Sequence, residues 1–156
     1  MAEVVILEDV DQIIFLLSEH KKNVANLYHN YYKKFPDHAV WLHLAQSKQK
    51  NHEFLQRFCF APKKLSPRTD DSIFKSSAIK TSMEWVNRLI EESQKHDIHT
   101  ALGYSLDLEQ SKIDQRYFDV FQNDAPEIKD ILPNITKEAQ EYIAIIESEL
   151  RKLGQN

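Results

Sequence analysis

The sequence predicts an all-α protein of one domain, a four-helix bundle with one additional shorter helix in a long crossover. Three observations favour this fold class. Glycine occurs only twice in 156 residues, and the five prolines leave long stretches without either helix breaker. Apolar residues recur in steps of three and four along these stretches, which places them on one face of a helix. No stretch shows the alternation of apolar and polar residues that is typical of a half-buried strand.

The spacing of the apolar residues and the positions of the prolines define the expected elements within one domain, residues 1–156. The break at Phe35-Pro36-Asp37 makes the first two helices antiparallel neighbours, with Asp37 as the N-cap of the second. His96-Asp97 ends the crossover helix, and Asp97 can cap the helix that follows. We expect four long helices at about 8–35, 37–58, 98–121 and 135–153, and a crossover helix at about 78–95.

Composition excludes several classes of function. A net charge of −4, with acids and bases mixed, gives no basic footprint for nucleic acid. Gly103 and Gly154 cannot assemble a glycine-rich phosphate loop. The single cysteine, Cys59, is compatible with a reducing cytosol, and no stretch approaches eighteen uninterrupted apolar residues. The acidic N-terminal stretch lacks the basic region of a signal peptide, so we expect a cytoplasmic protein without nucleic-acid or membrane partners.

Three of the four long helices carry polar or charged residues where their apolar face should continue. These interruptions are Lys21 in the first helix, Lys48 with Asn51 in the second, and Glu109 in the third. The last helix has Tyr142 at a comparable depth. Ionisable groups in a core are costly unless they are paired or bind a metal. The alternative is that both lysines extend their ammonium groups out of a narrow core into water.

Three stretches resemble the ferritin-like superfamily and, within it, the rubrerythrin-like bundles. The stretches are FPDHAVWLHLA at 35–45, ALGYSLDLE at 101–109 and TKEAQEYI at 136–143. The resemblance implies a bundle whose middle holds two metal ions, bound by one Glu from each of two helices and a Glu-x-x-His from each of the other two. It assigns the ligand positions to Lys21, Lys48, Asn51, Glu109, Ala139 and Tyr142, and Glu109 alone keeps a ligand residue.

The replaced ligands imply that a salt bridge has taken the place of the metal. Two lysines and Glu109 give the site a charge of about +1 before any metal enters, and an ammonium repels a cation. We expect Glu109 to pair with Lys21, Lys48 or both, with Asn51 and Tyr142 completing its hydrogen bonds. Removal of Glu109 is expected to cost about 3–5 kcal/mol, and no metal or other cofactor is expected.

The leading functional hypothesis is therefore a non-catalytic ferritin-like bundle that acts in protein interaction. The resemblance implies association through helix faces, so we expect a homodimer, with exposed Tyr32, Phe15 or Leu16 as contacts. The sequence does not indicate which other protein is bound.

Two alternatives from other classes stay open. The first is an iron- or manganese-binding oxidoreductase or iron-handling protein with an altered ligand set. It would use Glu109, His52, Glu138 and Glu141 in a shifted register. The second is a protein that binds a small anionic ligand in the bundle core, through Lys21, Lys48 and Tyr142.

Overall fold

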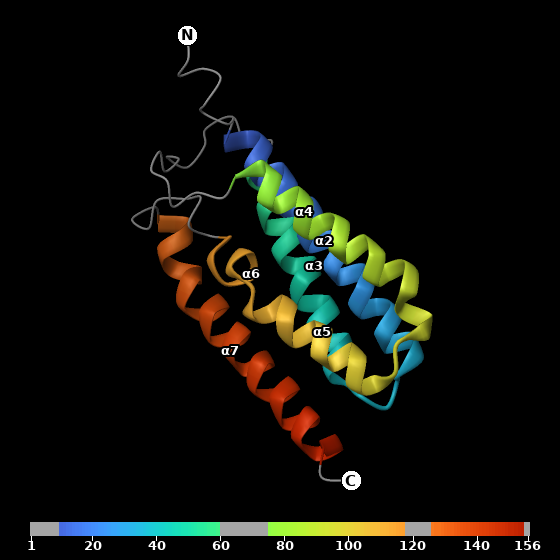
Figure 1. Cartoon of the computed structure of the whole chain (residues 1–156). Helices are drawn as coiled ribbons and strands as arrows, with labels where there is room; N and C mark the ends of the chain where they lie inside the picture. Colours follow the sequence, from blue (N-terminus) through green and yellow to red (C-terminus); the bar gives the residue numbers. More distant parts are fainter. Residues whose placement is uncertain (1–9, 60–74, 118–125, 155–156) are drawn as a thin grey trace.

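The computed structural model describes residues 10–59, 75–117 and 126–154, and every regular element in these ranges is helical (Figure 1). The all-α class predicted from the sequence is therefore confirmed. No described helix has the length and apolar character needed to cross a lipid bilayer. The elements are α2 (Val10–Lys34), α3 (Val40–Cys59), α4 (Ser76–Glu92), the 3₁₀ turn η1 (Ser93–Lys95), α5 (Ile98–Gln110), α6 (Lys112–Arg116) and α7 (Pro126–Gly154).

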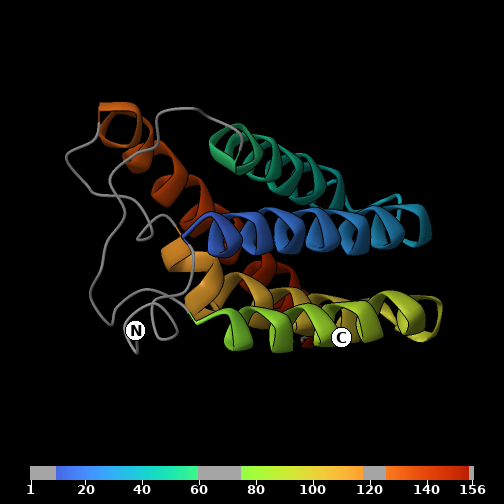
Figure 2. The same cartoon turned by 90° about the horizontal axis from the view of Figure 1, so that it is seen from above.

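The first two helices form a hairpin, and α2 lies between α3 and α4 (Figure 2). The chain reverses between Lys34 and Val40, where the amide of His38 donates to the carbonyl of Phe35 at 3.1 Å. α3 begins at Val40, three residues later than predicted, so Asp37 lies in the turn and is not the N-cap. The first helix was predicted from about residue 8, and its first two residues lie outside the described ranges.

The crossover helix extends from Ser76 to Glu92 and continues as η1 to Lys95, close to the predicted 78–95. α4 packs against α2 along its length. The predicted cap of the next helix is present, because the carboxylate of Asp97 accepts the backbone N–H of Thr100 at 2.7 Å. This bond also lowers the pKa of Asp97.

The helix predicted at 98–121 is broken, and this part of the prediction is wrong. α5 ends at Gln110, Ser111 adopts an extended backbone conformation, and α6 follows from Lys112 to Arg116. The Ser111 hydroxyl donates to the carbonyl of Leu108 at 2.8 Å and accepts the backbone N–H of Asp114 at 3.2 Å. Ser111 thus caps both helices, and such local hydrogen bonds allow a serine to end a helix. The predicted residues after Tyr117 lie outside the described part.

The last helix, α7, begins nine residues before the predicted position 135 and includes Pro133 in its interior. The prediction treated Pro133 as a helix boundary because a proline inside a helix lacks one backbone donor and crowds the preceding turn. Pro126 supplies the start instead, because the first helical position tolerates a proline. α7 packs mainly along α5 and makes fewer contacts with α3.

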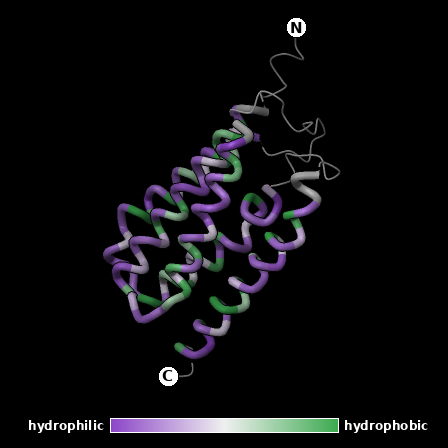
Figure 3. The backbone as a smooth tube through the Cα atoms, turned by 180° about the vertical axis from the view of Figure 1, so that it is seen from behind, coloured by the Kyte–Doolittle hydropathy of each residue, from purple (hydrophilic) through white to green (hydrophobic). Residues whose placement is uncertain are grey.

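The core divides into two apolar clusters. The larger surrounds Tyr28, Tyr31 and Trp41, near the turn between α2 and α3. The smaller contains Ile13, Leu17, Leu55, Ile79 and Tyr117, toward the other end of α2. Figure 3 shows both hydrophilic and hydrophobic residues along every helix, as expected for helices that each bury one face.

A buried polar layer lies between the two clusters. On α2 and α3 the buried residues that separate the clusters along the chain are all polar. They are Ser18, His20, Lys21, Ser47, Lys48 and His52. α5 and α6 contribute the buried carboxylates of Glu109 and Asp114.

Candidate functional site

Both lysines of the polar layer are enclosed by protein. Lys21 is 0% exposed and Lys48 is 3% exposed, and Glu109 is 0% exposed. The alternative in which the lysines reach solvent is therefore wrong. Charges at this depth require partners, because burial of an unpaired ion costs several kcal/mol.

Lys48 bridges two carboxylates at the centre of the layer. Its Nζ atom lies 2.8 Å from Oε1 of Glu109 and 2.8 Å from Oδ2 of Asp114. The other oxygen of Asp114 accepts a hydrogen bond from Lys21, whose Nζ atom also lies 3.9 Å above the centroid of the Tyr117 ring. Lys21, Lys48, Glu109 and Asp114 thus form one continuous chain of ion pairs, named here the charge network.

Glu109 is held by two different kinds of contact. The hydroxyl of Tyr28 donates a hydrogen bond of 2.6 Å to its Oε2 atom. Its Oε1 atom contacts Lys48 as an ion pair that lacks the alignment of a hydrogen bond. Burial and the nearby carboxylate of Asp114 raise the pKa of Glu109, whereas Lys48 and Tyr28 oppose this shift. Burial and Glu109 in turn raise the pKa of Tyr28.

The sequence did not identify Asp114 as a member of the network. Asp114 is five positions after Glu109, so on an unbroken helix the two side chains would point about 140° apart. The extended conformation of Ser111 breaks the helix between them, and Asp114 becomes buried with both lysines. The signal in the sequence is Ser-x-x-Asp at 111–114, a helix-start pattern inside a predicted helix.

The charge network is formally neutral, with two ammonium groups and two carboxylates. Burial alone would raise the pKa of Asp114, but the two lysines outweigh burial and hold this pKa well below its usual range. Burial alone would lower the pKa of Lys48, but the carboxylates of Asp114 and Glu109 outweigh burial and raise it. Burial lowers the pKa of Lys21 to about 8, with Asp114 acting in the opposite direction. The expected local charge of +1 is therefore corrected to zero by the inclusion of Asp114.

Four of the six positions assigned by the resemblance border one small cavity. Its volume is about 20 Å³, and Lys48, Asn51, Ala139 and Tyr142 all line it together with Asp114. The remaining two positions, Lys21 and Glu109, join this group through the ion pairs described above.

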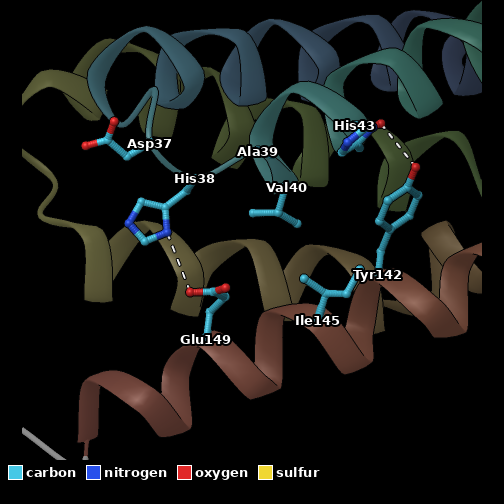
Figure 4. Close-up of a pocket in the computed structure, with 8 residues that line it drawn as sticks. All are labelled: Asp37, His38, Ala39, Val40, His43, Tyr142, Ile145 and Glu149. Carbon is cyan, nitrogen blue, oxygen red and sulfur yellow. Dashed lines mark hydrogen bonds and ion pairs between the residues drawn. The ribbon is translucent and has the colours of Figure 1, made fainter.

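Asn51 and Tyr142 do not complete the hydrogen bonds of Glu109, as had been expected. Tyr28 and Lys48 contact the Glu109 carboxylate instead. The Tyr142 hydroxyl donates to the carbonyl of His43 at 3.3 Å (Figure 4). Burial and the nearby carboxylate of Glu138 raise the pKa of Tyr142 to about 12.

The residues of the shifted-register metal alternative do not gather around one point. The Nδ1 atom of His52 lies 2.7 Å from the carbonyl oxygen of Ser18, and it must carry the hydrogen because a carbonyl only accepts. Glu138 lines the small cavity and Glu141 is exposed to solvent. Within residues 10–59, 75–117 and 126–154, no three residues of metal-binding type lie close enough together to hold an ion.

A buried histidine adjoins the charge network on the α4 side. The Nε2 atom of His20 lies 3.2 Å from the hydroxyl of Ser82, while its buried Nδ1 atom has no hydrogen-bond partner among the residues that the structure describes. Burial, followed by the charge of Lys21, lowers the pKa of His20 to about 4. The imidazole is therefore neutral at physiological pH.

Comparison with known proteins does not assign the chain to a family. No family model matches it, and no curated protein or solved structure shows significant similarity to it.

Proposed function

We propose that this chain is a rubrerythrin-like member of the ferritin-like superfamily in which the charge network replaces a di-metal centre. In this proposal the protein performs no metal-dependent oxidation and acts through association with other proteins. The observation that carries the proposal is the position of Lys48, whose ammonium lies 2.8 Å from both Glu109 and Asp114.

The charge balance supports the replacement. A divalent ion needs free carboxylate oxygens, but an ammonium group already contacts each carboxylate of the network. Two divalent ions would add four positive charges to a group that is already neutral. Both lysines would have to lose their protons or leave the core before a metal could bind.

The convergence of the six positions supports the link to the superfamily. The resemblance assigned them to four different predicted helices. Lys48, Asn51, Ala139 and Tyr142 border one cavity, and ion pairs connect the other two positions to it. The volume of about 20 Å³ has room for roughly one water molecule. This small volume argues against the alternative of an anionic organic ligand in the core.

Elemental analysis of the purified protein tests the replacement directly. The protein is expressed with iron, manganese and zinc supplied, purified without chelator and analysed by mass spectrometry. We expect far less than one metal ion per chain. About two equivalents of iron or manganese would overturn the proposal and favour an oxidoreductase.

A variant with restored ligands provides the positive control. It combines five substitutions that return carboxylates and imidazoles to the assigned positions: Lys21→Glu, Lys48→Glu, Asn51→His, Ala139→Glu and Tyr142→His. If the resemblance is correct, this variant gains iron or manganese that the natural chain lacks. A folded variant that binds no metal would remove the support for a ferritin-like ancestry.

The proposed association is supported by one exposed aromatic residue on α2. Phe15 is 47% exposed, so much of its ring is accessible to another protein surface. The three expected contacts do not form one patch, because Tyr32 lies about 25 Å along the helix from Phe15 and packs against the main core. Leu16 packs against the smaller cluster.

Sedimentation analysis tests the association. We expect a homodimer that Phe15→Ser converts to a monomer, with Gln12→Ser as a control at another exposed position of α2. A natural chain that stays monomeric at high micromolar concentration would contradict self-association through this face.

A further inference from the structure

A second and larger cavity lies outside the charge network, between the start of α3 and the C-terminal half of α7. This groove has a volume of about 410 Å³, within the range of small-molecule sites. Figure 4 shows that Asp37, His38 and Glu149 lie toward one end and His43 and Tyr142 toward the other.

The middle of the groove is apolar. Val40 on α3 and Ile145 on α7 lie across from each other between the polar ends (Figure 4). Ile145 is 43% exposed, and among the described residues Phe15 is the other large apolar side chain with such exposure. An aliphatic group placed between Val40 and Ile145 would remove this apolar surface from water, which is favourable in proportion to the area covered.

The end near Glu149 is negatively charged and poorly paired. With histidines counted as neutral, Asp37 and Glu149 are the charged residues of the lining, and no lysine or arginine is among the lining residues. Glu149 contacts His38 at 3.6 Å and the exposed Lys152 at 3.9 Å. Both separations exceed hydrogen-bond distance, so the carboxylate retains acceptor capacity for another donor.

The groove also sets the length of what it can hold. Tyr142 and Glu149 are seven residues apart on α7, which corresponds to about 10 Å along the helix. An extended chain of about six carbons with a charged group at one end fits this length. A metal ion does not fit the same observations, because no three ligand-type residues converge in the described part of the chain.

We propose that this groove binds a small organic cation, a primary ammonium group on an unbranched aliphatic chain. The ammonium donates hydrogen bonds to Glu149 and is attracted by Asp37, and the chain lies between Val40 and Ile145. This site is separate from the charge network, so it stands whether or not the proposed function is correct.

Three probes that differ only in the end group test the proposal by NMR titration of the whole protein. They are n-hexylammonium, 1-hexanol and hexanoate. We expect hexylammonium to cause saturable shifts at Ala39, Val40 and Ile145 with a Kd on the order of 1 mM. Hexanol should bind at least about tenfold more weakly, because it lacks the charge, and hexanoate should not produce these shifts.

Paired variants identify the groups responsible. Glu149→Gln should weaken hexylammonium about fivefold or more and leave hexanol unchanged. Glu147→Gln, on the same helix but outside the lining, serves as the charge-matched control and should change neither. Ile145→Ser should weaken both probes. The proposal is overturned if hexylammonium causes no saturable shifts up to about 50 mM, or if it binds no better than hexanol. Equal effects of Glu149→Gln and Glu147→Gln would also overturn it.

Discussion

Ser111 positions Asp114: its Oγ atom accepts the backbone N–H of Asp114 at 3.2 Å and starts α6 after the break in the chain. This hydrogen bond lies at the break that places Asp114, and not Ile113, in the charge network with Glu109. Without the break, the position four residues after Glu109 would point inward, and it holds Ile113. The charge network therefore depends on a local capping interaction outside it.

The first prediction compares two helix caps, Asp97 at the N-terminal end of α5 far from the network and Ser111 beside the network. Asp97→Ala removes the cap of α5 and should cost about 1 kcal/mol in the free energy of unfolding. Ser111→Ala should cost more, about 2 kcal/mol, because it removes a cap and also releases Asp114. Urea denaturation of both variants measures the difference. Equal costs would show that Ser111 acts as an ordinary cap.

The second prediction ranks the two buried carboxylates. Asp114→Asn should destabilise by about 3–5 kcal/mol, because both lysines lose a partner in a buried site. Glu109→Gln should cost less than the sequence suggested, about 1–3 kcal/mol, since Asp114 still contacts Lys48 and a glutamine oxygen can still accept from Tyr28. Asp107→Asn, at an exposed position of α5, is the control and should stay within about 0.5 kcal/mol. A larger loss for Glu109→Gln than for Asp114→Asn would contradict the bridging role of Asp114.

The third prediction concerns acid pH and His20. Burial lowers its pKa to about 4, below the value of about 6.5 in an unfolded chain. As pH falls from about 6.5 to 4, the unfolded state takes up the proton first, so this histidine reduces stability by up to about 3 kcal/mol. Above about pH 6.5 the imidazole is neutral in both the folded and the unfolded state, so this loss of stability is absent.

Urea denaturation at several pH values tests this prediction through the difference between the natural chain and His20→Gln. The variant should lose part of the pH dependence between pH 7 and 4.5. His29→Gln, at an exposed position of the same helix, should keep the full dependence. If His20→Gln and His29→Gln show the same profile, His20 does not titrate as a buried group.

The fourth prediction concerns the small cavity beside Lys48. Its volume of about 20 Å³ and its polar lining suit one ordered water molecule that bridges side chains of α3 and α7. A high-resolution crystal structure should show this water, and Ala139→Val should displace it. A cavity without density in the natural protein would contradict the prediction.

The sequence predicted the parts of the structure that depend on local pattern. Regular apolar spacing located α2, α3 and α4 to within a few residues. The same spacing showed that Lys21, Lys48 and Glu109 interrupt apolar faces, and the structure buries all three. These predictions needed only the periodicity of a continuous helix.

The sequence failed where one residue overrides that periodicity. Ser111 ends a helix inside an otherwise regular stretch, so the inward position moves to Asp114. Pro133 has the opposite effect on prediction, because it suggests a boundary where α7 continues. The break at Ser111 has a local signal, Ser-x-x-Asp at 111–114, which the regular apolar spacing around it outweighed. The continuation of α7 through Pro133 has no such local signal.

The neutrality of the charge network also restricts which sequences this chain can reach by single substitutions. Loss or reversal of any one of Lys21, Lys48, Glu109 or Asp114 leaves an unbalanced ion in a site that is almost fully shielded from solvent. The four positions are therefore coupled by epistasis, and tolerated changes must occur in opposite-charge pairs. Under the proposed function, a stepwise return to a metal-binding centre would pass through such destabilised intermediates, so the exchange of metal for ion pairs would be difficult to reverse.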